Sequence, residues 1–496
     1  MINADTMCDK TIDCFIPYVS PEQASATVEA LKSEPLVNNI YLLSSDSAAN
    51  ALDGCKMIVI DSLTSTATVR SVAAHAEAPY TLLYTKHTTL APGYLALARF
   101  ERIAADSGAG MLYADSYTVI DGKRSASPVI DYQEGSLRDD FNFGSVLFFN
   151  TSCLKLAAAG IDVDYQAAGL YDLRLRLSRI APIVHINEYL YSDVTVDNRK
   201  SGEKIFDYVD PRNRASQIEM EQACTAHLKE IGVYLEPEFE KISFDKGEFP
   251  VEASVIIPVR NRVRTIRDAI RSVLAQKTDF PFNLIIVDNH STDGTSEAID
   301  EFAADPRVVH LIPERDDLGI GGCWNLGVNN AACGKFAVQL DSDDVYADEN
   351  TLAKMVKAFY DQNCAMVVGT YKLTDIDLNT IPPGVIDHKE WTPDNGRNNA
   401  LRINGLGAPR AFYTPVLREI NVPNTSYGED YALGLAFSRR YQIGRVYDVV
   451  YFCRRWEDNS DAALDINKMN ANNLYKDRIR TWELQARRSL NAASCK

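Results

Sequence analysis

The sequence predicts an α/β protein made of two domains in tandem, each a mostly parallel sheet flanked by helices. Two observations lead to this prediction. Apolar runs of strand length alternate with amphipathic helical stretches through both halves of the 496-residue chain, an order typical of parallel α/β sheets. Details of the first half also recur in the same order in the second half, which indicates an internal duplication.

The first half begins with an apolar run that is closed by Pro17. Pro21 then opens a helix that carries Ala24, Val28 and Leu31 on one face, and proline is favoured at the first helical position. The expected strands of this half are 12–19, 40–43, 57–60 and 80–84, and its expected helices are 21–32 and 69–78.

The second half repeats this order. Its first apolar run is closed by Pro258, and the helix that follows extends to Gln276 with an apolar stripe. The second strand of this half ends in Asp288. The expected strands are 253–259, 284–287, 308–312 and 336–340.

The spacing between matching positions supports a duplication. Pro17 and Pro258 differ by 241 residues (258 − 17), and Tyr84 and Leu340 by 256 (340 − 84). A third matching pair, 171 and 431, differs by 260 residues (431 − 171). The increase in this offset along the chain arises mostly in the loop after Asp288. The alternative is that both halves are merely alternating α/β, but the shared order of details favours duplication.

These patterns predict four segments. Residues 1–197 form a degenerate, non-catalytic domain, 198–250 a helical linker, 251–460 a catalytic domain, and 461–496 a C-terminal helix. A basic helix can contact an anionic membrane, and the alternative is packing on the catalytic domain or on a partner. The basic residues of the C-terminal helix are Lys476, Arg478, Arg480, Arg487 and Arg488.

Composition excludes several classes of protein. The formal net charge of −17 argues against a nucleic-acid partner, which would require a basic surface. The ten cysteines form no CxxC pair and are typical of a reduced cytosolic protein. No signal peptide is recognised at the N-terminus, and no apolar run approaches 18 residues. We therefore expect a cytoplasmic protein, with peripheral contact at the inner face of the membrane left open.

The strand 336–340 is followed by Asp341, Ser342, Asp343 and Asp344. Three carboxylates within four residues repel one another, and hard oxygen ligands at this density suit Mg²⁺ or Mn²⁺. Ligands of open α/β sheets bind beyond the carboxyl ends of the strands, where these acids are expected. A helix N-terminus is the alternative, because Asp and Ser are good caps.

The acids are present in one half only. Thr85, Lys86 and His87 stand opposite 341–343, and Gly169 and Leu170 stand opposite Glu429 and Asp430. A lysine in place of metal-binding carboxylates removes most of the affinity for a divalent cation. The first domain is therefore expected to be inactive in this chemistry.

Residues 252–456 resemble the family 2 glycosyltransferases of the GT-A fold, and the first domain looks like a degenerate copy of that fold. The resemblance is specific because several motifs occur in order at the expected distances. They are SVIIPVRNR (254–262), SVLAQ (272–276), IIVDNHSTDGT (285–295), WNLGVNNA (324–331), QLDSDD (339–344) and GEDYAL (428–433).

The resemblance implies transfer of a hexosyl-type sugar from a nucleotide-diphospho-sugar, in first place a UDP-sugar, to a hydroxyl of a carbohydrate or glycoconjugate acceptor. It also implies inversion, Mn²⁺ or Mg²⁺ as cofactor, and a role in glycan or polysaccharide synthesis. Asp430 matches the catalytic base. Implied donor-binding residues are Pro258, Asn261, Asp288, Asp341, Arg454 and Arg455; implied metal ligands are Asp341 and Asp343; and implied acceptor-binding residues are Glu429 and Trp456.

Two positions depart from the family pattern. Asn289 and His290 stand where the common motif continues with a second aspartate, which alters contacts to the base or ribose. The late loop has Arg454, Arg455 and Trp456 where relatives use histidine, so a third protein ligand to the metal is not implied.

The chemistry required is consistent with these residues. A divalent ion that bridges diphosphate oxygens stabilises the negative charge that grows as the sugar departs, and an arginine can add a bidentate contact. A carboxylate near the acceptor hydroxyl accepts its proton, and attack opposite the diphosphate gives inversion.

Two other functions remain open from the sequence. One is a nucleotidyltransferase of similar fold, which leaves the GED motif unexplained. The other is a non-catalytic scaffold that binds nucleotide or sugar, and the intact acids of the second half count against it. Measuring donor hydrolysis and its dependence on a metal ion would distinguish the glycosyltransferase, the nucleotidyltransferase and the scaffold. Acceptor specificity is expected within 370–428.

Overall fold

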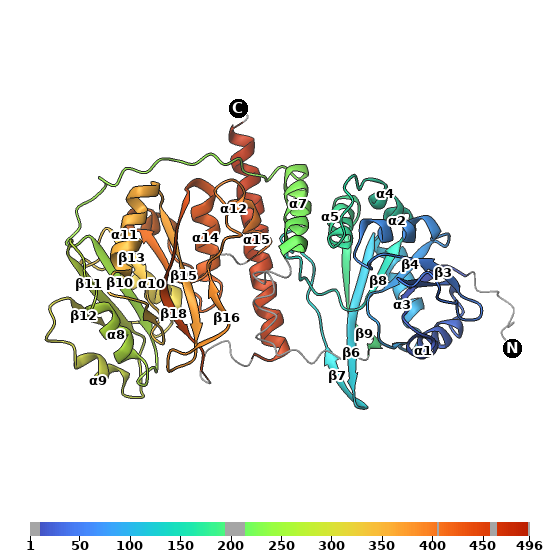
Figure 1. Ribbon diagram of the computed structural model, residues 1–496, viewed down its shortest axis with the longest axis horizontal. Helices are drawn as coiled ribbons and strands as arrows, with labels where there is room; N and C mark the ends of the chain where they lie inside the picture. The colour runs from blue at the N-terminus through green and yellow to red at the C-terminus, as the bar shows by residue number, and fades with distance from the viewer. Residues whose placement is uncertain (1–9, 194–213, 404–405, 457–463, 495–496) are drawn as a thin grey trace. The chain divides into compact units, whose positions relative to one another are not determined.

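The structure is a computed structural model that describes residues 10–193, 214–403, 406–456 and 464–494 (Figure 1). The chain divides into two compact units. Unit 1 comprises 1–233 with 464–484, and unit 2 comprises 234–463 with 485–496.

Unit 1 contains one sheet and its covering helices. Helix α1 shows how local sequence sets an element: the Ser20 hydroxyl accepts a hydrogen bond from the amide of Gln23, and Pro21 occupies the first turn. The elements are β1 (Ile12–Pro17), α1 (Pro21–Lys32), β2 (Val37–Ser44), β3 (Lys56–Val59), α2 (Thr66–His75), β4 (Tyr80–Tyr84), β5 (Leu90–Pro92), α3 (Ala96–Ser107), β6 (Met111–Ile120), β7 (Lys123–Ser127), β8 (Val146–Asn150), α4 (Thr151–Ala159), α5 (Gly169–Ile180), β9 (Ile183–Asp193) and α7 (Arg214–Glu230).

Unit 2 has a sheet of the same kind. Its strand β10 is an apolar run in which all residues but Pro258 are buried. The elements are β10 (Ala253–Val259), α8 (Ile266–Leu274), β11 (Phe282–Asp288), α9 (Thr295–Asp300), β12 (Val308–Leu311), α10 (Ile320–Asn329), β13 (Phe336–Gln339), β14 (Val345–Tyr346), α11 (Thr351–Gln362), β15 (Met366–Thr374), β16 (Thr380–Ile386), α12 (Gly396–Asn399), β17 (Arg410–Tyr413), α13 (Thr414–Ile420), α14 (Glu429–Arg440) and β18 (Ile443–Arg454).

The two sheets have the same topology. The strand order is β3-β2-β1-β4-β8-β6-β9-β5 in unit 1 and β12-β11-β10-β13-β17-β15-β18-β14 in unit 2. An additional hairpin strand pairs at the same place in each, β7 with β6 and β16 with β15. Each strand of one sheet thus has a counterpart in the other, and the prediction of two tandem α/β domains is confirmed.

The sheets are mixed rather than mostly parallel. The strands β2, β1 and β4 are parallel neighbours, as are β11, β10 and β13. Antiparallel pairing begins at β8 and β17. The antiparallel half of each sheet comes from strands such as β6, β8, β15 and β17, which the apolar alternation did not reveal.

Strand registers give the spacing of the duplication. Ile12 pairs with Tyr80 in unit 1, and Ala253 pairs with Phe336 in unit 2. The offset is therefore 241 residues at the first strand (253 − 12) and 256 at the next parallel strand (336 − 80). Helices α5 and α14 start 260 residues apart (429 − 169) and have equal length. These values equal the offsets found in the sequence.

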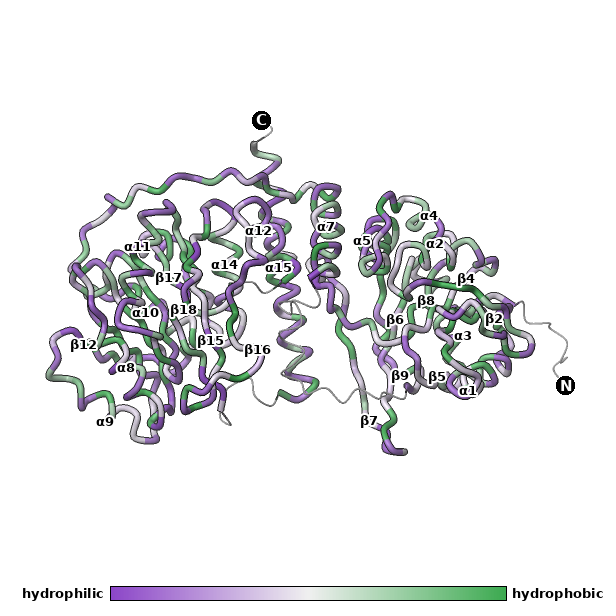
Figure 2. Tube along the Cα trace, in the orientation of Figure 1, coloured by the Kyte–Doolittle hydropathy of each residue, from purple (hydrophilic) through white to green (hydrophobic). Residues whose placement is uncertain are grey.

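Helix α7 packs on α5 within unit 1. The C-terminal helix α15 (Ile466–Ser494) contributes residues to both units, and Figure 2 shows hydrophilic and hydrophobic residues mixed along it. Two of its five predicted basic residues, Arg480 and Arg487, are fully buried. Arg480 pairs with Asp477, and Arg487 donates to the backbone carbonyl of Arg397. In the described part of the chain, no helix is long and apolar enough to span a membrane.

Candidate active site

Three parallel strands of unit 2, β10, β11 and β13, run in the same direction and therefore end at one edge of the sheet. This edge carries Pro258 at the end of β10, Asp288 at the end of β11 and Asp341 just after β13. Ligands of α/β sheets bind at such an edge. The predicted donor-binding residues of these three strands are thus brought together.

Asp341 lies beside the end of β13 with its carboxylate held by a neighbour. The Gln339 side chain donates to Asp341 Oδ1 at 2.8 Å, and the Asp341 amide donates to the Tyr451 hydroxyl at 3.1 Å. Burial raises the pKa of Asp341 above its ordinary value. The hydrogen bond from Gln339 and the charge of Arg410 lower this pKa but do not cancel the effect of burial.

Asp344 is the buried acid of this loop. Its Oδ1 accepts a hydrogen bond from the Arg454 amide at 2.7 Å. Burial, followed by the charges of Asp343 and Asp341, raises its pKa well above the ordinary value. Like charges gathered out of water need a cation, so the donor set fits a hard divalent ion.

The protein supplies few ligands for such an ion. Asp343 is half-buried, and Arg262 Nε lies 3.7 Å from its Oδ2. Across the described residues, no group of three His, Cys, Asp or Glu side chains is arranged to hold a metal ion.

The three residues of the late loop lie in different surroundings. Arg454 is buried, its Nε donates to the carbonyl of Asp343, and its Nη1 lies 3.1 Å from Asp268 Oδ2. Arg454 thus fixes the acidic loop to α8. Arg455 is half-buried, and its amide donates to the carbonyl of Thr374. The guanidinium carbon of Arg264 lies over the indole ring of Trp456, 5.2 Å from the centre of that ring.

The end of β11 is tightly hydrogen-bonded. Asp288 is fully buried and accepts from the Ser291 amide at 3.0 Å and from the Ser296 hydroxyl. The neighbouring Asn289 is also buried; its Nδ2 donates to a backbone carbonyl, whereas its Oδ1 has no hydrogen-bond partner among the described residues. Asn261 has a positive φ of 55° and bridges to this loop by accepting from the Thr292 amide.

Sequence reasoning missed Arg410, the residue that links the two acidic motifs. It lies at the start of β17, and its Nε donates to Gln339 Oε1 at 3.0 Å. Its Nη1 donates to Asp430 Oδ2 at 2.6 Å. The acidic loop after β13 and the start of α14 are thereby joined through one buried guanidinium. A single arginine in a short strand carries no motif that would have revealed it.

Glu429 and Asp430 form the first turn of α14, after Gly428, which has a φ of 77°. Burial, followed by the charge of Asp430, raises the pKa of Glu429 to about 7. Its Oε2 is buried and has no hydrogen-bond partner in the described part of the structure. The site therefore contains two acids with different surroundings.

The glycine-rich segment before Trp324 forms the start of helix α10. Gly321 and Gly322 lie in α10, packed on residues 422–425. A Cβ on Gly321 would lie 1.8 Å from the carbonyl oxygen of Pro423. These glycines allow close packing between two backbone segments.

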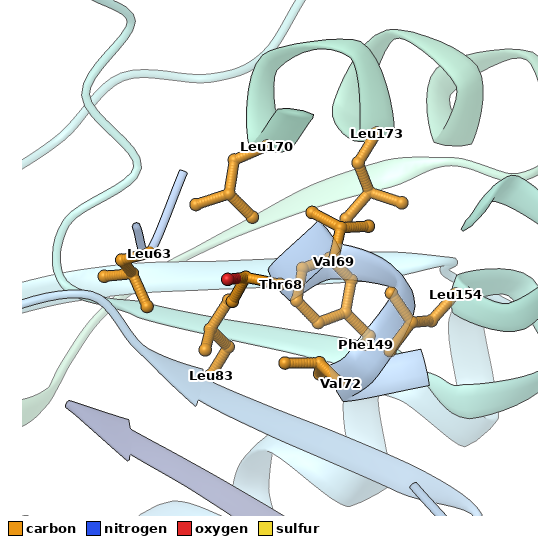
Figure 3. Close-up of a pocket in the computed structure, with 9 residues that line it drawn as sticks. All are labelled: Leu63, Thr68, Val69, Val72, Leu83, Phe149, Leu154, Leu170 and Leu173. Atoms are coloured by element: carbon orange, nitrogen blue, oxygen red, sulfur yellow. The ribbon is translucent and has the colours of Figure 1, made fainter. Parts of the chain in front are cut away.

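The matching place in unit 1 is apolar. Leu83 occupies the position of Gln339 (339 − 83 = 256), and Leu147 faces it across the sheet as Arg410 faces Gln339. Leu170 replaces Asp430. Figure 3 shows that this place is a small pocket, lined by Leu63, Thr68, Val69, Val72, Leu83, Phe149, Leu154, Leu170 and Leu173.

Other residues of unit 1 fill the place of the acids. Lys86, opposite Ser342, pairs with the buried Asp193 at 2.6 Å. A Cβ on Gly169, the counterpart of Glu429, would lie 2.3 Å from the amide nitrogen of Thr66. Glu219 of α7 accepts hydrogen bonds from three backbone amides just before α5. Unit 1 lacks both the acids and the space for them.

Comparison with known proteins identifies the class of unit 2. Residues 254–417 match the model of glycosyl transferase family 2, so unit 2 contains a domain of that family. Recognition of this family from the sequence is confirmed. The matched segment includes the β10 loop, the acidic loop after β13 and Arg410.

Several curated proteins are similar in sequence to parts of the chain. One from Rickettsia felis, described as an uncharacterized glycosyltransferase, is 29% identical over 56% of this chain and 48% of its own length. A second, the putative teichuronic acid biosynthesis glycosyltransferase TuaG of Bacillus subtilis, is 27% identical over 30% of this chain and 58% of its own. The chain thus spans about half the length of these relatives.

Solved structures are similar in part. Residues 1–349 of TarS from S. aureus, in complex with UDP-GlcNAc, are 22% identical with a TM-score of 0.37, over 48% of this chain and 72% of that one. A mannosyltransferase from Pyrobaculum calidifontis, in complex with GDP-Man and Mn²⁺, is 18% identical with a TM-score of 0.34, over 57% and 85%.

Proposed function

We propose that this protein is a metal-dependent glycosyltransferase that moves a sugar from a UDP-sugar to a carbohydrate or glycoconjugate hydroxyl with inversion, in glycan or polysaccharide synthesis. Unit 2 is the catalytic unit, and unit 1 has no catalytic role. One observation supports this most strongly. The sheet edge of unit 2 gathers the acidic loop and the Glu429–Asp430 pair around Arg410, whereas the matching place in unit 1 is apolar.

The donor would lie across the ends of β10, β11 and β13. Asp288 and Asn289 would contact the base, and the amide oxygen of Asn289, which has no hydrogen-bond partner among the described residues, would accept a hydrogen bond from a base N–H. Asp341 and Asp343 would hold Mn²⁺ or Mg²⁺, which stabilises the charge of the leaving diphosphate when bound. Arg455 is the arginine of the late loop proposed to contact the diphosphate, because Arg454 is tied to Asp268 and the acidic loop.

The acceptor would approach from the side of α14. Trp456 offers a ring for stacking on a sugar, and Glu429 and Asp430 supply carboxylates at the start of the helix. One of this pair accepts the proton of the attacking hydroxyl. Attack from the side opposite the diphosphate inverts the anomeric centre.

Hydrolysis of the donor tests this function without knowledge of the acceptor. The purified chain is incubated with a panel of UDP-sugars and GDP-mannose, with Mn²⁺ or with EDTA, and free nucleotide is measured. We expect Mn²⁺-dependent release from at least one donor, and a loss of about 100-fold or more in Asp343→Ala. Lys86→Ala, at the matching loop of unit 1, is the control and should retain wild-type release. Equal release by Asp343→Ala and wild type would refute the assignment.

A further inference from the structure

We infer that the acceptor carries a negatively charged group, a phosphate or a carboxylate, and that Arg260 and Arg264 in the loop between β10 and α8 bind this group. This inference rests on the proposed function. It specifies the chemical class of the acceptor.

The loop between β10 and α8 carries three arginines at alternate positions, Arg260, Arg262 and Arg264. The matching loop of unit 1, residues 18–20 between β1 and α1, has the sequence Tyr-Val-Ser and carries no charged side chain. The arginines therefore occur in the same unit as the acids of the candidate site. This is the distribution expected of residues that serve the chemistry of that unit.

The backbone of this arginine loop is fixed. Three successive amides of the loop donate hydrogen bonds to side chains of the segment that follows β11. The pairs are Asn261 with Ser291 at 2.9 Å, Arg262 with Thr295 at 2.8 Å, and Val263 with Asp293 at 3.1 Å. The exposed side chains of Arg260 and Arg264 thus project from an anchored backbone. A binding loop that is ordered in advance lowers the entropic cost of binding a ligand.

Arg264 lies beside the aromatic ring proposed for the acceptor. Its guanidinium carbon is 5.2 Å from the ring centre of Trp456, and that of Arg262 is 6.0 Å from the same point. Arg262 also faces the carboxylate of Asp343, with Nε 3.7 Å from Oδ2. Arg264 forms no ion pair with any described residue. Two positive charges therefore approach one ring, and the outer one has no carboxylate beside it.

The lack of a carboxylate partner sets Arg260 and Arg264 apart from other arginines of unit 2. Three other exposed arginines form ion pairs, Arg271 with Asp268, Arg315 with Asp317 and Arg440 with Glu240. Neither Arg260 nor Arg264 has such a pair within the described part of the chain. Acids outnumber basic residues by 68 to 51 in the sequence, so carboxylate partners are abundant. Two exposed guanidinium groups at the site are thus available for an anion from a ligand.

The anion is more consistent with the acceptor than with the donor or a membrane. The diphosphate of the donor already has the proposed metal ion and Arg455. Binding to an anionic membrane surface typically uses clusters of about four to eight basic residues, whereas this loop has three, one of which faces Asp343. A guanidinium group matches a phosphate or a carboxylate with two parallel hydrogen bonds. A charged group on the acceptor would therefore lie next to Trp456.

Calorimetry on the full chain saturated with UDP and Mg²⁺, which fills the donor site, tests this inference. The probes are trigalacturonate, its fully methyl-esterified neutral form, and glucose 6-phosphate. We expect at least one anionic probe to bind and the neutral ester not to bind, and the anionic probe that binds identifies a carboxylate or a phosphate. Arg264→Gln and Arg260→Gln should each weaken this binding by about 10-fold, and Arg264→Lys should weaken it less. Added salt should also weaken it, because exposed charges are screened.

The control variant is Arg440→Gln, which changes an exposed arginine at the last position of α14 and should bind the probes as wild type does. The Kd for UDP should stay within about 2-fold of wild type in all variants. Equal binding of the acid and its ester, binding of neither anionic probe, or unchanged binding in Arg264→Gln would overturn the inference. A loss of UDP affinity of about 10-fold in Arg264→Gln would overturn it by assigning this arginine to the donor.

A membrane is the remaining alternative. Sedimentation with vesicles of phosphatidylglycerol and phosphatidylcholine that requires Arg264, without binding of either anionic sugar, would replace the charged acceptor with a lipid surface. A wild-type protein that binds no UDP refutes the proposed function itself, which is a separate result.

Discussion

Replacing Arg410 by methionine should destabilise unit 2, because it leaves a carboxylate without its cation. Arg410 is buried, whereas the side chain of Asp430 is 37% exposed. Breaking a fully buried ion pair costs about 3–5 kcal/mol. Water can solvate part of Asp430, and exposed pairs contribute less than about 1 kcal/mol, so we expect a loss of about 2–3 kcal/mol for Arg410→Met.

Urea unfolding followed by tryptophan fluorescence measures this loss. Three of the four tryptophans (Trp324, Trp391 and Trp456) lie in unit 2, so the signal reports mainly on that unit. The control is Leu147→Met, the matching position of unit 1. The double variant Arg410→Met/Asp430→Asn should recover about 1–2 kcal/mol, because the uncompensated charge is gone. A free energy of unfolding within about 0.5 kcal/mol of wild type for Arg410→Met would refute the reasoning.

Three further predictions concern unit 1. Burial opposes the charging of His185, but hydrogen bonds with Asp115 and Asp131 raise its pKa overall; its stabilising effect is therefore complete below its ordinary pKa and lost as pH rises through the raised value. His185→Gln should accordingly lower Tm more at pH 5.5 than at pH 8.5, and an equal loss at both would contradict this. Glu219→Gln should cost about 1–2 kcal/mol in urea unfolding, because three backbone amides lose an ionised acceptor; an unchanged midpoint would count against that role. Lys86→Ala removes an ion pair with the buried carboxylate of Asp193 and should therefore lower Tm without changing UDP affinity. A loss of UDP binding in this variant would instead indicate a nucleotide site in unit 1.

Much of the fold could be predicted because the parallel strands are apolar runs with clear ends. Helix α1 has the predicted bounds, since Pro21 and the serine before it define its start. The repeat offsets were also found correctly, because they depend on residues at strand ends and helix starts. The antiparallel strands were missed: β17, for example, is a run of only four residues, too short to show an alternation of apolar and polar residues.

The candidate site was predicted only where acids form local motifs. Asp341 and Glu429 stand in recognisable motifs, whereas Arg410 and Gln339 act through contacts between strands that are distant in sequence. Sequence also gives no information on which arginine turns inward. Arg454 is buried and donates a hydrogen bond inside the protein, and which arginine becomes buried depends on tertiary packing.

Of the two units, only unit 2 is expected to bind a nucleotide together with a divalent ion. Calorimetric titration of UDP into the full chain, with and without Mn²⁺, tests it most directly. We predict one site per chain that requires Mn²⁺, disappears in Asp343→Ala and persists in Lys86→Ala. No binding of UDP or GDP to the folded wild-type protein under any metal condition, or two equal sites per chain, would contradict a single nucleotide site in unit 2.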